Sequence, residues 1–178
     1  PDMYMDKIAI GHGYPPGIID LDLSPTENLT RLAKAKGAPV SDICACLLDR
    51  ERHAAIIAEL RAAGAKIRLI PDGDVAGVFW TTETERSGVD IYFGSGGAPE
   101  GVLAAAAIRC AGGQLQGRLL PGNEAEAARA RAMGHADVSM KLTLDDMVKG
   151  DVVFAASGVT SGSMFEGVLF EGSGARVD

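Results

Sequence analysis

A glycine-rich segment between an apolar run and an alanine-rich run constrains the fold of this chain most. Residues 89–93 are apolar except at Asp90, which is typical of a buried strand. Residues 94–101 read Gly-Ser-Gly-Gly-Ala-Pro-Glu-Gly, and the alanine-rich run 102–109 favours a helix. We therefore predict a strand, a glycine-rich turn over 94–101 and a helix, in that order.

The predicted turn is a candidate ligand site, because glycines let backbone N–H groups approach a ligand closely. The N-terminus of the following helix suits phosphate, and the carboxylate of Glu100 at this mouth suits a divalent cation. Two plainer interpretations remain open: a turn that only connects two elements, and a glutamate that only complements the helix dipole. A P-loop is excluded because no Lys-Ser/Thr pair follows the glycines, and the Rossmann spacing is not met.

Strand and helix patterns alternate along the chain and predict an α/β fold with a mostly parallel sheet flanked by helices. Ser24 to Glu27 form a capping box with proline at the first helical position, and Gly37 is suited to the end of that helix. Strands are expected at 7–10, 18–23, 43–48, 67–70, 90–93, 114–120 and 151–156. Helices are expected at 25–36, from 54 up to Gly64, and at 75–80, 124–133 and 143–148.

Polar residues follow three of the predicted strands. Arg50, Arg52 and His53 follow the strand at 43–48, Asp72 and Asp74 follow the strand at 67–70, and the glycine-rich segment follows the third. Ligands of such sheets bind beyond the carboxyl ends of the strands. We therefore expect these three sets to converge on one site.

Two roles are open for the charged sets. Arg50 and Arg52 are suited to bidentate contact with phosphate, or they form the solvated start of a helix. Asp72 and Asp74 are suited to a metal or to sugar hydroxyls, or they form an Asx turn that caps the next helix. We interpret His53 as a structural residue of the first helical turn rather than as an acid or base.

Composition limits the partners of the chain. A net charge of −7 over 178 residues argues against a general nucleic-acid binder. The longest apolar run, 102–108, is too short to span a membrane, so we expect no membrane partner. Three cysteines without zinc or disulfide spacing predict reduced thiols and a cytoplasmic protein.

Six short motifs match one known family in their order along the chain. They are Pro1-Asp2-Met3-Tyr4-Met5, Arg52-His53, Ile70-Pro71-Asp72-Gly73-Asp74-Val75-Ala76, Gly96-Gly97-Ala98-Pro99-Glu100-Gly101-Val102, Gly117-Arg118-Leu119-Leu120 and Phe165-Glu166-Gly167-Val168. On these residues the chain resembles class II fructose-1,6-bisphosphatase, a bacterial type within the lithium-sensitive phosphatase superfamily. The resemblance implies a layered sugar-phosphatase fold in which a mixed, mostly parallel sheet is flanked by helices, with only the second half of the family fold present.

The resemblance also implies an activity and a site. It implies hydrolysis of fructose 1,6-bisphosphate to fructose 6-phosphate and phosphate in gluconeogenesis and glycerol metabolism, with sedoheptulose 1,7-bisphosphate as a second substrate in some lineages. Mn²⁺ or Mg²⁺ is the implied cofactor, and a homo-oligomer is the expected assembly. The implied metal ligand is Glu100, and the implied substrate-binding residues are Tyr4, Arg50, Glu51, Arg52, Asp72, Gly73, Asp74 and Gly97. No catalytic residue is assigned.

One departure from the family pattern concerns the metal. The family contributes further metal carboxylates, including a segment of the type Asp-Pro-Ile-Asp/Glu-Gly-Thr, before the point that corresponds to residue 1, and this sequence has no such segment. Glu100 alone is a poor site for Mg²⁺ or Mn²⁺, which need several oxygen ligands. We therefore expect residues 1–178 to be the C-terminal portion of a sugar-bisphosphatase domain, inactive alone, whose N-terminal metal-binding portion is absent. The alternatives are a non-catalytic sugar-phosphate-binding module and an inositol-phosphate-type phosphatase.

Overall fold

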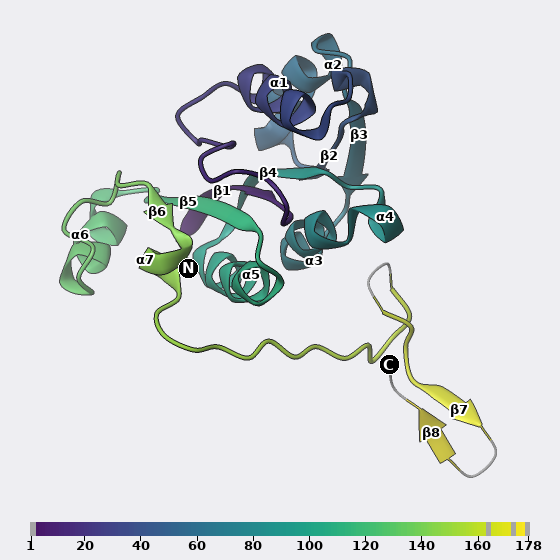
Figure 1. Ribbon diagram of the computed structural model, residues 1–178. Coiled ribbons are helices and arrows are strands. Elements are labelled where there is room, and N and C mark those ends of the chain that lie inside the picture. The colour runs from purple at the N-terminus through teal and green to yellow at the C-terminus, as the bar shows by residue number, and fades with distance from the viewer. Residues whose placement is uncertain (1–2, 163–164, 172–173, 177–178) are drawn as a thin grey trace.

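A six-stranded sheet forms the centre of the molecule (Figure 1). The computed structural model describes residues 3–162, 165–171 and 174–176, so Pro1 and Asp2 of the first motif lie outside the described residues. The strand order is β3-β2-β4-β1-β5-β6. These strands are β1 (Tyr4–Ile10), β2 (Cys44–Leu48), β3 (Lys66–Ile70), β4 (Ile91–Gly97), β5 (Gln114–Leu120) and β6 (Leu142–Thr143).

The sheet is mixed, and its strand directions confirm the predicted α/β class. Strand β2 pairs in parallel with both β3 and β4, whereas β1 lies antiparallel between β4 and β5. Strands β2, β3, β4 and β5 therefore all run in one direction, and β1 and β6 run in the other. Because β1 is inverted, its first residue lies beside the carboxyl end of β4, with Tyr4 opposite Gly97.

Helices cover both faces of this sheet (Figure 1). The longer ones are α1 (Pro25–Lys36), α2 (Ala54–Ala62), α5 (Ala98–Ala111) and α6 (Glu124–Ala132). The shorter ones are α3 (Asp74–Phe79), α4 (Thr84–Ser87), α7 (Leu144–Met147) and the 3-10 turns η1 (Val40–Asp42), η2 (Glu51–His53) and η3 (Trp80–Glu83). The capping box at Ser24 and the left-handed Gly37, with φ 69°, begin and end α1 as predicted. No helix within the described ranges has the length and apolar character needed to cross a membrane.

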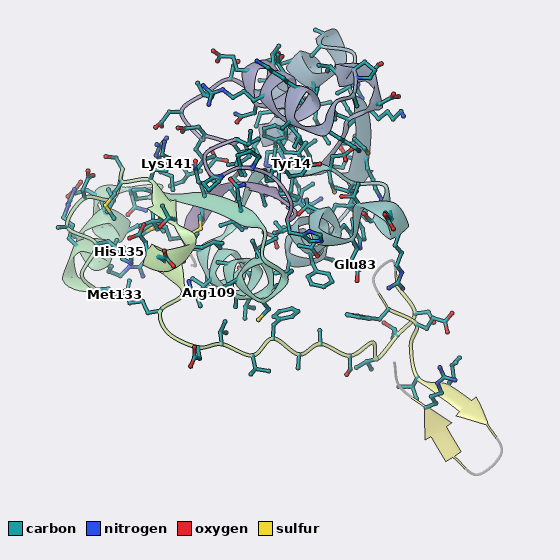
Figure 2. The ribbon with its side chains drawn as sticks, in the orientation of Figure 1. Tyr14, Glu83, Arg109, Met133, His135 and Lys141 are labelled. Atoms are coloured by element: carbon teal, nitrogen blue, oxygen red, sulfur yellow. The ribbon has the colours of Figure 1, made fainter. Side chains whose placement is uncertain are left out.

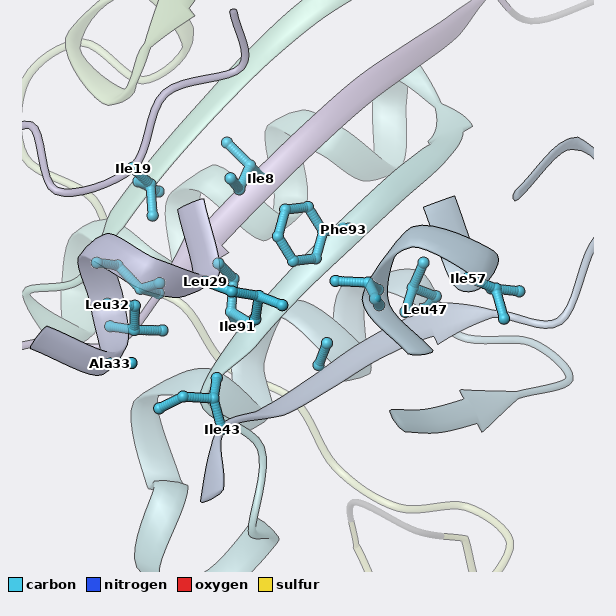
Figure 3. Close-up of a cluster of buried hydrophobic side chains, with 13 residues drawn as sticks. Ile8, Ile19, Leu29, Leu32, Ala33, Ile43, Leu47, Ile57, Ile91 and Phe93 are labelled. Atoms are coloured by element: carbon cyan, nitrogen blue, oxygen red, sulfur yellow. The ribbon is translucent and has the colours of Figure 1, made fainter. Parts of the chain in front are cut away.

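Alternating side chains divide the core between the two faces. Ile91 and Phe93 point to one face and pack with Leu29 of α1 and Ile57 of α2 (Figure 3). Tyr92, between them, points to the other face, where α3 and α5 pack. Each fully buried aliphatic or aromatic side chain contributes about 1.5–3 kcal/mol through loss of contact with water. Burial on both faces explains why β2 and β4 are continuous apolar runs in the sequence.

The glycine-rich segment differs from the prediction of a turn over 94–101. Residues 94–97 belong to β4, and α5 begins at Ala98 rather than at Val102. The cause is β1, which pairs with β4 along its whole length and satisfies the backbone of the glycines as strand residues. The sheet therefore extends up to the helix.

The predicted strand at 18–23 is wrong. This segment is a turn held by Asn28, whose amide donates to the carbonyl oxygens of Asp20, Leu23 and Ser24 at 2.9–3.3 Å. Ile19 is still buried in the core. The alternating pattern therefore came from one-sided burial of a turn and not from a strand.

The predicted strand at 151–156 is also wrong. No strand is assigned to these residues, and within the described ranges the only additional sheet is the hairpin of β7 (Leu169–Glu171) and β8 (Gly174–Arg176). Val152 packs at the edge of the α5 face, and the ring of Phe154 stacks on Phe79 with 6.0 Å between centroids. Apolar anchoring to helices, without a partner strand, thus accounts for the hydrophobic pattern.

Candidate functional site

A polar pocket of about 450 Å³ opens at the carboxyl ends of β2, β3 and β4. It is lined by residues from each predicted polar set: Tyr4, Leu48, Arg50, Arg52, Asp72, Asp74, Gly96, Gly97 and Glu100. The expected convergence of three strand ends therefore occurs, and the inverted β1 adds Tyr4 to it. Of the residues implied by resemblance, Glu51 and Gly73 do not line the pocket, and both are exposed.

The glycines of this segment leave room for side chains of the site. A Cβ on Gly96 would overlap the Asp74 carboxylate, and one on Gly97 would overlap the Glu100 carboxylate. A Cβ on Gly94, whose φ is 133°, would lie 2.9 Å from the ring of His53. Such distances exclude any larger residue unless the neighbour moves. Three close side-chain neighbours thus adjoin the glycines, and of these the exposed carboxylate of Glu100 is the one with room to move aside.

Asp74 forms a buried ion pair with Lys7. Asp74 is the first residue of α3, and its side chain is 9% exposed; the Lys7 side chain, from the middle of β1, is 0% exposed. Lys7 Nζ donates to Asp74 Oδ2 and lies 3.5 Å from the carbonyl oxygen of Gly97. A carboxylate paired in this way is held in place and is charge-compensated.

Arg52 is held between a strand and an aromatic ring. Its Nε donates to Ser95 Oγ at 3.0 Å, and its Nη2 donates to the carbonyl oxygen of Ser95 at 2.7 Å. Its guanidinium carbon lies 5.0 Å from the centroid of the Tyr4 ring, a cation–π distance. The guanidinium is therefore pre-oriented at the wall of the pocket, as bidentate binding of an oxyanion requires.

His53 has a structural role, in agreement with the interpretation from sequence. The residue is 1% exposed, and its Nε2 accepts a hydrogen bond from the Ser95 backbone N–H at 2.9 Å. That bond makes Nδ1 the protonated nitrogen, which donates to the carbonyl oxygen of Leu48 at 2.9 Å. The imidazole thereby links the ends of β2 and β4 below the pocket.

The exposed members of the pocket have mainly local partners. Arg50 donates to the neighbouring carbonyl oxygen of Asp49 at 3.0 Å, and Asp72 accepts from the N–H of Gly73 at 2.9 Å. No side chain caps the N-terminus of α3, so Asp72 does not act as the cap that an Asx turn would supply. Arg50, Asp72 and Glu100 therefore present free hydrogen-bonding capacity to a ligand.

The residues of the pocket do not by themselves fit a divalent cation. Within the described part of the chain, no group of three or more His, Cys, Asp or Glu side chains is placed to hold a metal ion. Mg²⁺ and Mn²⁺ need several oxygen ligands, and Glu100 supplies one carboxylate.

Two residues of the site were missed from the sequence. Lys7 offered one signal, because a lysine at the start of the apolar run 8–10 needs a partner if it is buried. Ser95 offered none, since a serine between glycines is ordinary in a turn. Both became visible only when β1 and β4 were paired.

A larger cavity, of about 560 Å³, lies elsewhere. It is mainly apolar, and its lining includes Met5 of β1, Val102 of α5 and Ala130 of α6, with Met133 just beyond that helix. Figure 2 shows Met133 and His135 at this side of the molecule, around α6. None of the residues predicted to bind substrate or metal lines this cavity, so the smaller polar pocket is the candidate site.

Comparison with known proteins identifies the family. The family model described as bacterial fructose-1,6-bisphosphatase, glpX-encoded, matches residues 1–178. The fructose-1,6-bisphosphatase class 2 of Haemophilus influenzae is 42% identical over an alignment of 187 positions, which covers 97% of this chain and 55% of that protein. The fructose-1,6-bisphosphatase 1 class 2 of Escherichia coli K12 is 41% identical with the same coverage. The chain thus spans about half the length of the curated relatives that it matches.

Proposed function

The chain belongs to the bacterial fructose-1,6-bisphosphatase family, and from this membership we propose that its polar pocket binds the substrate of a sugar bisphosphatase. The observation that supports this most is the convergence of Arg50, Arg52, Asp72 and Asp74 on one pocket at the carboxyl ends of parallel strands. Relatives that match nearly the whole chain are named fructose-1,6-bisphosphatases.

The chemistry of the pocket suits a sugar phosphate. Arg52, which is already oriented by Ser95, and Arg50 offer guanidinium groups for a phosphate. The carboxylates of Asp72 and Asp74 suit sugar hydroxyls as acceptors. We propose fructose 1,6-bisphosphate as the substrate of the whole protein, with fructose 6-phosphate and phosphate as products, and sedoheptulose 1,7-bisphosphate as a second candidate.

We propose further that Glu100 is one ligand of a Mn²⁺ or Mg²⁺ site whose other ligands lie outside residues 1–178. The exposed carboxylate of Glu100 at the pocket supports this, and the lack of a three-ligand group in the described residues means that the other ligands would have to come from elsewhere. It agrees with the proposal that the chain is the C-terminal portion of a longer domain. We propose that the whole protein acts in gluconeogenesis, in the cytoplasm and as a homo-oligomer.

A second candidate is a module that binds a sugar phosphate without hydrolysing it. The incomplete metal-ligand set favours it, because the phosphate-binding residues are present while the carboxylates that would bind a cation are too few. The two candidates differ in turnover and not in binding.

Two proteins are needed for the test: the 178-residue chain, and the same chain joined to the part of the Escherichia coli relative outside the match. Affinity for fructose 1,6-bisphosphate is measured by calorimetry, and phosphate release is measured with Mn²⁺ and with Mg²⁺. We expect both proteins to bind, and only the joined protein to release phosphate, with loss of that activity in Glu100→Ala. Binding without release by the joined protein would favour the second candidate, and absence of binding by both would contradict the proposed function.

A further inference from the structure

Lys7 lies directly behind the pocket. Its side chain is fully buried and donates to Asp74 Oδ2, whereas the Asp74 side chain reaches the pocket wall. Lys7 is not among the residues that line the pocket, so a ligand there touches Asp74 and not Lys7. The contacts of Lys7 with the pocket are therefore its ion pair with Asp74 and its approach to the carbonyl oxygen of Gly97 at 3.5 Å.

The surrounding backbone is shaped around this ion pair. A Cβ on Gly96 would lie 3.1 Å from Lys7 Nζ, besides overlapping the Asp74 carboxylate. A Cβ on Gly101, in the first turns of α5, would lie 3.4 Å from Lys7 Cδ and 2.5 Å from the sulfur of Met5. Two glycines of the family motif thus adjoin the lysine, and their lack of side chains leaves the space that its buried side chain occupies.

The charges of the pocket suit a cation at this position. The charged residues that line it are two arginines and three carboxylates: Arg50, Arg52, Asp72, Asp74 and Glu100. The ammonium group of Lys7 brings the positive groups to three and balances the set. Without it, a phosphate would meet an uncompensated carboxylate in a poorly hydrated position, where like charges repel strongly.

We propose that Lys7 is a positioning residue for Asp74, which fixes the orientation of that carboxylate toward the pocket and compensates its charge so that a sugar phosphate can bind. The proposal rests on the proposed function in taking a sugar phosphate as the ligand. Its first half, the fixing of Asp74, holds in the ligand-free protein as well.

A double-mutant cycle on Lys7→Met and Asp74→Asn tests this proposal. Dissociation constants for fructose 1,6-bisphosphate are measured by calorimetry on the 178-residue chain, with the thermal midpoint of each variant. We expect each single change to weaken binding about tenfold, and the double change to be within about threefold of Asp74→Asn, because residues in one ion pair are coupled. The proposal would be overturned if the loss of affinity in the double variant equalled the product of the two single losses. It would also be overturned if Lys7→Met changed the thermal midpoint but not the affinity.

Lys36→Met is the matched control. Lys36 pairs with Asp90, a 2% exposed carboxylate at the other end of β4, and neither residue lines the pocket. We expect this change to lower the thermal midpoint and to leave the affinity within about twofold, since distant sites behave independently. Weakening equal to that of Lys7→Met would show a general effect of losing a buried ion pair and would overturn the proposal.

The ligand-free protein separates this inference from the proposed function. If the unaltered chain binds no fructose 1,6-bisphosphate, the proposed function fails, and the ¹³Cγ resonance of Asp74 decides the inference instead. We expect Lys7→Met to shift and broaden this resonance, while Lys36→Met leaves it unchanged. An unaltered Asp74 resonance in Lys7→Met would overturn the inference.

Discussion

Two lysine–aspartate pairs lie at opposite ends of β4, and they differ in what surrounds the carboxylate. Asp90 precedes the strand, bonds to Lys36 and also accepts the backbone N–H of Cys44 at 2.9 Å. Asp74 adjoins the carboxyl end of the strand, bonds to Lys7 and faces a pocket. The Lys36 side chain is 33% exposed and that of Lys7 is fully buried.

This difference shows how one interaction serves two purposes. At the Asp90 end, Lys36 and the backbone N–H of Cys44 each donate to one oxygen of the carboxylate, so the pair links α1 to the sheet. At the Asp74 end, part of the carboxylate stays available to a ligand. The lysine supplies the hydrogen bond that the carboxylate would receive from water in an open site. The site end of the sheet is therefore the more constrained, and substitutions there should have the larger effects.

The largest effect is expected for Gly96→Ala at the site end. A methyl group there overlaps the Asp74 carboxylate and crowds Lys7, which should lower the free energy of unfolding by about 1–3 kcal/mol and weaken sugar-phosphate binding. Gly64→Ala, at a left-handed position with φ 81° and open space around it, is the control. It should cost about 1 kcal/mol and leave binding unchanged. Urea unfolding measures the stability of both variants and calorimetry their affinity; equal losses of affinity would show that the effect of Gly96→Ala is not specific to the site end.

A smaller effect is expected for Arg52→Lys. Lysine keeps the charge but loses the forked contacts to Ser95 and the stacking on Tyr4, so affinity for fructose 1,6-bisphosphate should fall about tenfold with little change in stability. Arg68→Lys is the matched control, because Arg68 stacks on Trp80 at 4.0 Å and donates to the carbonyl oxygen of Ser87, away from the pocket. Calorimetry measures the affinity of both variants for fructose 1,6-bisphosphate. Unchanged affinity in Arg52→Lys would contradict a phosphate-binding role for Arg52.

The smallest effect is expected for Lys141→Met, away from both ends of β4. Hydrogen bonding to Lys141 lowers the pKa of Asp20 below its usual 3.8 and joins the turn at 18–23 to the residue that precedes β6. A lowered pKa in the folded state gives stability that is present above pH 3.8 and is lost as the pH falls through the folded value. The variant should therefore unfold slightly more easily than the unaltered chain near pH 6, and the difference should vanish near pH 2. A difference in urea midpoint that persists at pH 2 would contradict this cause.

The sequence predicted most elements where local signals agree with tertiary packing. The capping box at Ser24, Gly37 at the end of α1 and the apolar runs of β2 and β4 each specify their structure within a few residues. It failed at 18–23 and 151–156, where apolar residues are buried by a turn and by an extended segment. Periodicity reports which side chains are buried, and it does not report whether a partner strand exists.

The candidate site was predicted in part for a similar reason. The polar sets at strand ends follow from the rule that parallel strands end at one edge, and the resemblance to a phosphatase family assigned them roles that stay predictions. Lys7 and Ser95 were missed because their partners are distant in the chain: Lys7 and Asp74 are 67 residues apart, and Ser95 and Arg52 are 43 apart. No local pattern encodes such pairs.

The sequence by itself determined the alternation of strands and helices, the family and the residues gathered at the strand ends. Only the tertiary structure decided that β1 runs inverted between β4 and β5, which adds Tyr4 to the pocket and places Lys7 behind Asp74. It also decided that the glycines at 94, 96 and 97 are strand residues that make room for His53, Asp74 and Glu100. Strand direction and close side-chain approach depend on contacts between distant segments, and the hydrophobic pattern of any one segment is the same for either arrangement.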